Sequence, residues 1–240
     1  MENKTYAEEI FDKNHVEKHV KTLFENIEPQ YGRWTTPIKY RIIGKMTERS
    51  LASVASIFEY LERLTNVKAT KAVSDDDANF LIIFSDGFEQ LADNVDIQKI
   101  FMNEGESVGQ FKKRMTLGKE KDGNITSFAK KYYDAAGRVV GYAVLDNPFV
   151  SEEPASNYYL KTVVSGYLDF NFSNVFDSSI FNSAALSSDY FEGVVTGLHE
   201  VDEVLLKELY LFRDEKTLEK SEFQFKLAER IYKKKSPDSE

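Results

Sequence analysis

The sequence contains no cysteine and only three histidines among its 240 residues. Without cysteine the chain cannot form disulfides, hold a metal through thiolates or use a cysteine nucleophile. With three histidines, any metal site built on imidazoles would draw on very few donors. The P-loop and the Gly-x-Gly-x-x-Gly fingerprint are also missing, which removes two common signatures of nucleotide binding. The glycine-containing stretch GESVGQF lacks the Lys-Ser/Thr of a phosphate-binding loop, and we interpret it as a mobile loop.

Two further absences limit the class of protein. The net charge is −9, so concentrated positive charge for a nucleic acid backbone is lacking, and we expect no nucleic acid partner. No apolar run approaches the ~20 residues that a membrane span requires, so we predict no membrane-spanning helix. The first fifteen residues lack the basic start and apolar run of a signal peptide. Both a cytoplasmic protein and one whose leader has been removed stay open.

What the sequence does contain is a large supply of core-forming side chains, including 18 Phe and 13 Tyr. Residues spaced three and four apart predict helices, whereas alternating or continuous apolar runs predict strands. We expect one α+β domain over residues 14–235, with a mixed twisted sheet, packed helices and C-terminal helices, between flexible segments at 1–13 and 236–240. The predicted helices are 14–27, 47–64, 89–102, 155–170, 202–210 and 218–235; the predicted strands are 37–44, 66–73, 78–86 and two strands within 125–147.

The stretch TGLHEVDEVLLKELY raises the question of a metal site. A zinc-peptidase helix reads His-Glu-x-x-His, because a four-residue step puts two imidazoles on one face and the glutamate between them acts as a base. Here the second histidine is replaced by Glu203, after His199 and Glu200. The alternative is an ordinary helix whose first turn is acidic because negative charge is favoured at a helix N-terminus. The sequence favours the ordinary helix, and a zinc site at these three residues is the weaker alternative.

Other metal-binding patterns are incomplete. His15 and His19 are also four residues apart, but the intervening glutamate is missing, and we expect a solvent-facing pair beside the buried Val16 and Val20. The aspartates at positions 75 to 77 are consecutive and not alternating as in a calcium loop, so an acidic turn is favoured. We therefore predict neither a metal nor another cofactor.

A resemblance to a known family adds to this interpretation. The stretches RWTTPIKYRIIG, LERLTNV, DANFLIIFSD, DSSIFNS and DEVLLKELY follow one another along the chain. In this order they resemble an uncharacterised bacterial family whose members are described as lipoproteins and look like zincin metallopeptidases in fold. The resemblance covers residues 33–210, and the last two stretches are its most specific parts. It implies a zincin-like fold and a location in the cell envelope or outside the cell.

The resemblance also implies where a zincin active-site helix would lie. That helix corresponds to YYLKTVVSGYLDF, which has Thr162 and Val163 where related sequences carry acidic residues, and it contains no histidine. The Asp-x-x-Leu-Leu-x-x-Leu-Tyr stretch begins at Asp202, so His199 precedes a different helix. No catalytic residue is predicted, and this copy of the fold would be a pseudoenzyme.

The loop DSSIFNS is the remaining candidate site. It is predicted to be either a structural loop or an interaction loop, with the residues Asp177, Ser179, Ile180, Phe181 and Asn182. Aromatic residues at 158, 159, 172 and 176 fit a protein interface as well as a core. We expect a non-catalytic domain that binds a protein partner, or associates with itself, in the bacterial envelope; the alternative is a divergent metal-dependent hydrolase.

Overall fold

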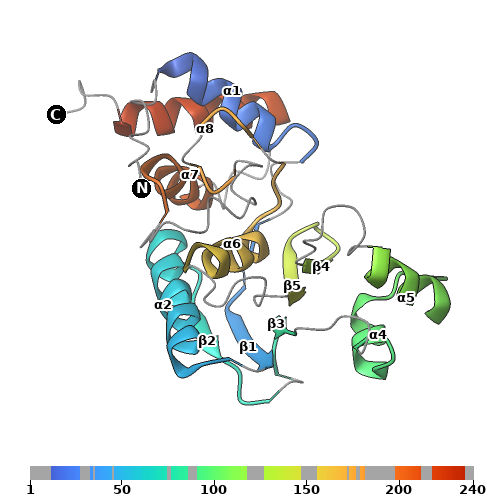
Figure 1. Ribbon diagram of the computed structural model, residues 1–240. Helices are drawn as coiled ribbons and strands as arrows, with labels where there is room; N and C mark the ends of the chain where they lie inside the picture. The colour runs from blue at the N-terminus through green and yellow to red at the C-terminus, as the bar shows by residue number, and fades with distance from the viewer. Residues whose placement is uncertain are drawn as a thin grey trace, which may run out of the picture.

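A five-stranded mixed sheet with helices on both faces forms the body of the molecule in the computed structural model (Figure 1). The structure describes residues 12–27, 33–34, 36–44, 46–74, 77–85, 91–117, 127–146, 156–171, 173–176, 179–181, 198–211 and 218–235.

The strand order is β2-β1-β3-β5-β4. The first four of these strands are parallel to their neighbours, and β4 pairs with β5 in the antiparallel direction at the edge of the sheet. The strands are β1 (Ile38–Gly44), β2 (Ala69–Lys71), β3 (Phe80–Phe84), β4 (Ser127–Tyr133) and β5 (Val139–Asp146).

The described helices surround this sheet and continue beyond it. They are α1 (Lys13–Leu23), α2 (Glu48–Thr65), α4 (Val95–Phe101), α5 (Val108–Leu117), α6 (Ser156–Tyr167), α7 (Glu200–Leu211) and α8 (Lys220–Lys235). In Figure 1, α1 and α8 lie side by side above α7, at the far end of the molecule from α4 and α5.

The ends of α2 show how local sequence sets these boundaries. The Thr47 side chain accepts a hydrogen bond from the backbone N–H of Ser50 at 3.1 Å, which satisfies a donor that the first turn leaves free. At the other end Asn66 adopts φ 60°, a left-handed conformation that asparagine tolerates and that stops the helix. Both ends therefore fall within one or two residues of the positions predicted from the sequence.

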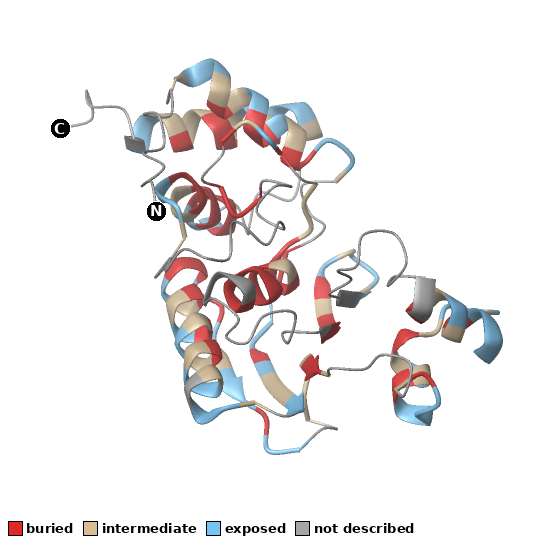
Figure 2. Ribbon diagram, viewed as in Figure 1, coloured by how far each residue is buried: buried red, intermediate tan, exposed pale blue. Residues whose placement is uncertain are grey.

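The main core lies between one face of the sheet and helices α2, α6 and α7. Alternate residues of β3, namely Phe80, Ile82 and Phe84, point into it, and the ring of Phe80 lies within 5.5 Å of the rings of Phe58 and Trp34. Figure 2 shows most of the described part of α6 as buried, between the sheet and α7. The aromatic surplus of the sequence therefore fills this layer.

A second, smaller core covers the opposite face of β3 and β5. Ile83 and Leu145 pack there against Ile97 and Phe101 of α4 and Phe111 of α5. Because both faces of β3 are covered, its sequence reads as a continuous apolar run, as we predicted.

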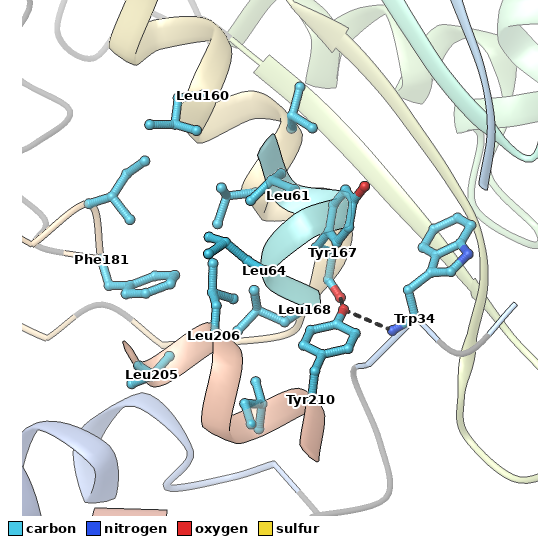
Figure 3. Packing of buried hydrophobic residues seen from close by; sticks show 14 of the residues in the cluster. Trp34, Leu61, Leu64, Leu160, Tyr167, Leu168, Phe181, Leu205, Leu206 and Tyr210 are labelled. Atoms are coloured by element: carbon cyan, nitrogen blue, oxygen red, sulfur yellow. Dashed lines mark hydrogen bonds between the residues drawn. The ribbon is translucent and has the colours of Figure 1, made fainter. Parts of the chain in front are cut away.

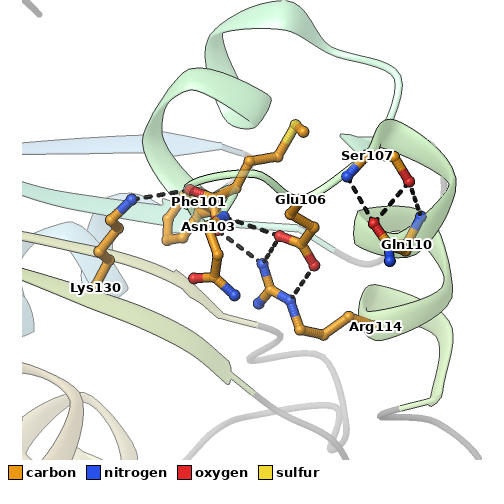
Figure 4. A network of polar contacts seen from close by, with 8 residues as sticks. Phe101, Asn103, Glu106, Ser107, Gln110, Arg114 and Lys130 are labelled. Carbon is orange, nitrogen blue, oxygen red and sulfur yellow. Dashed lines mark hydrogen bonds and ion pairs between the residues drawn. The ribbon is translucent and has the colours of Figure 1, made fainter.

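The region between β3 and β4 corrects one prediction. GESVGQF is not a mobile loop, because its last residues begin α5. Ser107 and Gln110 form a capping box: the Gln110 side chain accepts from the N–H and hydroxyl of Ser107, and the Ser107 hydroxyl accepts from the Gln110 N–H (Figure 4). The stretch also fits the Gly-x-Ser-x-Gly pattern of serine hydrolases, but its serine stands between two helices and caps the second.

A charged pair fixes α5 against α4. Arg114 donates two hydrogen bonds of 2.9 Å to the Glu106 carboxylate and one of 2.8 Å to the Phe101 carbonyl (Figure 4). The Arg114 hydrogen bonds hold the pKa of Glu106 down at about 2. The pair thus stays ionised at any ordinary pH and orders the turn between the helices.

The described residues form the α+β architecture that the sequence predicted, with a mixed sheet and C-terminal helices α7 and α8. Several helix starts differ from prediction. The helix predicted at 89–102 is interrupted at 92–94, and α4 begins at Val95 with Asn94 as its N-cap, while α8 begins at Lys220. α1 begins at Lys13 with Asp12 as its N-cap, and α7 begins at Glu200.

Candidate functional site

Helix α6 is the segment in which the family resemblance implies a zincin active site. Its residues from Tyr159 to Val164 are all buried, including Thr162 and Val163. Gly166 lies directly against the sheet, where an added Cβ would come 2.3 Å from Phe80 and 2.7 Å from Tyr142. The helix therefore offers hydrophobic packing, and its only buried charged side chain is Lys161.

Lys161 is a notable member of this helix because its ammonium is buried. Burial lowers the pKa of Lys161 to about 8. A single buried amine does not replace the two imidazole ligands that a zincin helix presents to its metal ion.

The C-terminal end of α6 is tied to α7. The Tyr210 hydroxyl donates a 2.6 Å hydrogen bond to the Tyr167 carbonyl and accepts one of 3.3 Å from the Trp34 N–H (Figure 3). The Arg33 guanidinium donates to the Leu209 carbonyl at 2.7 Å, near the C-terminus of α7. The tyrosine of the Asp-x-x-Leu-Leu-x-x-Leu-Tyr stretch thus has a structural role.

The aspartate of the same stretch holds the candidate loop. Asp202 is fully buried, and its carboxylate accepts 2.7 Å hydrogen bonds from the Ser179 hydroxyl and from the Ile180 N–H. The Ser179 oxygen in turn accepts from the Phe181 N–H. These contacts join the two most specific stretches of the family resemblance into one unit.

The described part of the DSSIFNS loop lies inside the protein. Ser179, Ile180 and Phe181 are all buried, and the Phe181 ring packs edge-on against Phe170. This is the geometry of a structural loop, and these three residues offer no surface to a partner. Asp177 and Asn182, the other two residues of this candidate site, lie outside the described residues.

The His-Glu pair stands at the N-terminus of α7. The His199 ring nitrogen Nδ1 accepts from the Val201 N–H at 3.4 Å, and the His199 carbonyl accepts the first helical hydrogen bond, from Glu203. The Glu203 carboxylate forms an ion pair with Lys207 at 2.9 Å, and Glu200 is exposed. His199 therefore caps the helix, and the structure does not bring these three residues into a ligand set.

The prediction that His15 and His19 both face solvent is wrong for His19. His15 is partly exposed and lies 3.0 Å from the Asp12 carboxylate, but His19 is fully buried. The His19 Nδ1 lies 2.9 Å from the Ser173 hydroxyl, and its ring meets Phe176 edge-on at 5.0 Å. Burial lowers the pKa of His19 to about 4, so the ring is neutral at neutral pH. The helical spacing could not show that a loop 150 residues later covers this position.

Aromatic residues 159 and 176, which fitted an interface as well as a core, are both in the core. Residue 172 lies outside the described part, as does the side chain of residue 158.

The edge strand β4 carries a polar arrangement that the sequence analysis missed. Lys131 donates to the Leu168 carbonyl at 2.7 Å and to the Asp169 carboxylate at 2.5 Å. The other carboxylate oxygen of Asp169 accepts from the Tyr133 hydroxyl at 2.9 Å. Burial lowers the pKa of Lys131, which the neighbouring carboxylate opposes, and burial with Asp169 raises that of Tyr133. This network fastens β4 to the end of α6.

The alternate residues of β4 are held on the opposite face. Lys130 donates to the Met102 carbonyl at 3.0 Å, and the Tyr132 hydroxyl donates to the Ile100 carbonyl at 3.1 Å. The only sequence signal for this pattern is the stretch Lys-Lys-Tyr-Tyr at 130–133 within a predicted strand. It could not be assigned, because the acceptors are backbone carbonyls and a carboxylate from distant segments.

Comparison with family models, with curated proteins and with solved structures gave no match to this chain. Within the described residues, no three His, Cys, Asp or Glu side chains gather closely enough to hold a metal ion. None of the described helices combines the length and apolar character of a membrane span.

Proposed function

We propose that this chain is a non-catalytic, zincin-like domain that binds an extended segment of another protein along the edge strand β4. The carrying observation is the combination of an edge strand whose outer side pairs with no described strand and a helix α6 whose residues from Tyr159 to Val164 are all buried. The family resemblance alone supports placing the protein in the bacterial cell envelope.

The non-catalytic part of the proposal rests on where the donor side chains lie. His199 caps α7, Glu203 pairs with Lys207, and Asp202 holds the loop at 179–181. His19 is buried against Ser173 and lies in α1, at the opposite end of the sequence from His199. The alternative, a divergent hydrolase using His199, Glu200 and Glu203, has no arrangement among the described residues in its favour.

The binding part rests on the geometry of β4. In an antiparallel pair, each strand turns about half of its backbone N–H and C=O groups away from its neighbour. β4 pairs with β5 on one side only, and among the described residues no other strand pairs with its outer edge. Such an edge can accept an extended chain as an additional strand.

The other edge of the sheet is a poorer candidate. β2 spans only Ala69–Lys71, and Thr70 and Lys71 are exposed there. Short edge strands with lysines discourage pairing with other chains. The pairing of β4 with β5 steps from Gly141 to Val139 opposite Tyr132 and Tyr133, so the extra residue lies in β5 and none is inserted into β4.

The test is selection from a displayed library of random peptides, followed by mapping of the bound peptide with backbone amide chemical shifts. The proposal predicts peptides that bind in extended form and shift the amides of residues 127–133. Light scattering of the isolated chain tests the alternative that the chain associates with itself. A library that yields no ligand, or ligands whose shifts lie away from β4, contradicts the proposal.

A further inference from the structure

We infer that Tyr132 and Tyr133 are preformed anchors that make the β4 edge selective for an uncharged segment with apolar side chains on both faces. This inference rests on the proposed binding along β4 and adds the chemistry of the partner.

The two lysines of β4 carry the charge that a docking segment would meet. Read as sequence, the Lys-Lys-Tyr-Tyr of β4 suggests a positively charged edge. In the structure both ammonium groups turn inward: Lys130 donates to the Met102 carbonyl, and Lys131 to Leu168 and Asp169. A lysine whose ammonium is held by internal acceptors offers mainly its methylene stem to a neighbour. The Asp169 carboxylate compensates the charge of Lys131, and the Glu106 carboxylate lies close enough to Lys130 for their charges to interact, so a docking segment meets little net charge along this strand.

Tyr132 is held on three sides. Its hydroxyl donates to the Ile100 carbonyl, and the Lys130 ammonium lies 5.7 Å from the centre of its ring. On the neighbouring strand, the space above Gly141 is filled by Tyr132, since a Cβ at Gly141 would come 3.1 Å from the ring. The side chain is nevertheless 39% exposed. Its polar end is satisfied, so the remaining exposure offers ring surface.

Tyr133 repeats this arrangement on the opposite face of the strand. Its hydroxyl donates to Asp169, and 49% of the residue is exposed. Successive side chains of a strand point to opposite faces, so one ring lies on each face of the sheet at β4, that of Tyr132 against Gly141 of β5.

The hydrogen bonds of the two tyrosines lower the free-energy cost of docking. Ordering a flexible side chain at an interface costs about 0.5–1.5 kcal/mol, and burying an unpaired hydroxyl costs more. Both tyrosines are already ordered by their hydrogen bonds, and covering their rings breaks none of them. The geometry thus favours apolar side chains at two successive positions of the bound segment, because successive side chains point to opposite faces and would contact one ring each.

The experiment uses the full chain and synthetic peptides of about nine residues, the length of an ordinary strand or longer. Each probe is a threonine peptide with a central pair of successive valines, leucines, aspartates or lysines, so that both faces of the extended peptide carry the tested side chain. The inference predicts binding of the valine and leucine probes, weaker binding of both charged probes, and little change in affinity between low and high salt.

The variants are Tyr132→Ala and Tyr133→Ala, with Phe225→Ala as the control, since it removes an exposed ring from α8, far from β4. Each tyrosine variant should lower affinity about ten-fold, as expected for an aromatic anchor, and the control should leave it unchanged. Tyr132→Phe and Tyr133→Phe keep the rings and should retain most of the binding. If an alanine variant unfolds, shifts of the tyrosine ring resonances in the wild type on adding the valine probe replace it.

The outcomes separate the two proposals. If apolar probes shift the β4 amides but both alanine variants bind like the wild type, the anchors are wrong and the proposed function stands. Preferential, salt-sensitive binding of a charged probe at β4 overturns the selectivity in the same way. If no probe binds and the displayed library also yields no β4 ligand, the proposed function itself fails.

Discussion

Asp202 lies in the first turn of α7, where the helix dipole favours a carboxylate, yet its side chain is fully buried. Its two oxygens accept hydrogen bonds from Ser179 and Ile180. The residue therefore links a helix start to a loop more than twenty positions earlier in the chain.

The Asp202→Asn variant tests this link. An amide presents one oxygen and one NH₂ group to two donors, so one hydrogen bond is lost and a buried donor is left facing another donor. We expect a loss of about 1–3 kcal/mol in the free energy of unfolding, measured in urea.

Asp96→Asn is the matched control, because Asp96 occupies the first turn of α4 and is highly exposed. It should change stability by less than about 0.5 kcal/mol. Equal effects of the two substitutions would mean that the dipole, and not the buried hydrogen bonds, accounts for the role of Asp202.

His19 gives a prediction about pH. Burial lowers the pKa of His19 from 6.5 to about 4, so between these values the unfolded chain binds a proton that the folded chain does not. Stability from this residue is complete above pH 6.5 and falls as the pH drops toward 4. At roughly 1.4 kcal/mol per pH unit the loss is about 3 kcal/mol.

The measurement is urea unfolding of the wild type and of His19→Gln across this pH range. Carboxylates contribute to both chains alike, so the difference isolates the histidine. The wild type should lose about 3 kcal/mol more than the variant between pH 6.5 and 4. Parallel pH profiles would show that His19 titrates normally and is accessible to water.

Among single residues, the sequence revealed roles that depend on near neighbours and concealed those that depend on distant ones. The cap at Thr47 and the core positions Val16 and Val20 follow from spacing within one helix. The burial of His19 depends on Ser173 and Phe176, and the role of Asp202 depends on Ser179. No local pattern records such long-range contacts.

At the scale of elements, α6 is defined by how closely it approaches the sheet. Gly166 meets the rings of Phe80 and Tyr142 at distances that leave no room for a methyl group. The sequence predicted a buried helix here from its apolar content. It could not predict the approach, because that distance is set by β3 and β5.

For α6 we predict that the same substitution, glycine to alanine, changes the stability in opposite directions at two positions of the chain. Alanine is favoured over glycine within helices by up to ~1 kcal/mol. Gly166→Ala should nevertheless destabilise the protein by about 1–3 kcal/mol, because the rings must move. Gly109→Ala in α5, where a Cβ would contact nothing within 4 Å, should be neutral or stabilising. Thermal unfolding of both variants decides this, and a stabilised Gly166→Ala would contradict the close packing.

For the edge strand β4, the sequence predicted the secondary structure but not the chemistry of its surface. Its strand character was predictable from the Ala-Ala-Gly turn that follows it. Its surface chemistry was not, since two lysines and two tyrosines become an edge of largely satisfied polar groups only when carbonyls from Ile100, Met102 and Leu168 are in place.

For the whole molecule, the mixed sheet with helices on both faces follows from patterns that each span one element. The continuous apolar run of β3 correctly indicated two covered faces. The strand order did not follow, because pairing of β3 with both β1 and β5 brings together segments separated by long stretches of chain. The same limit applies to the candidate site, whose residues come from β4, from the end of α6 and from α4.

The central claim is that the histidines and carboxylates of this chain support its structure, and that it acts by binding. Zinc content after purification from zinc-supplemented medium, compared between the wild type and His199→Ala, tests this most directly. We predict no stoichiometric zinc in either protein and no cleavage of peptide substrates. One zinc per wild-type chain, lost in the variant together with peptide-bond hydrolysis, would contradict the account.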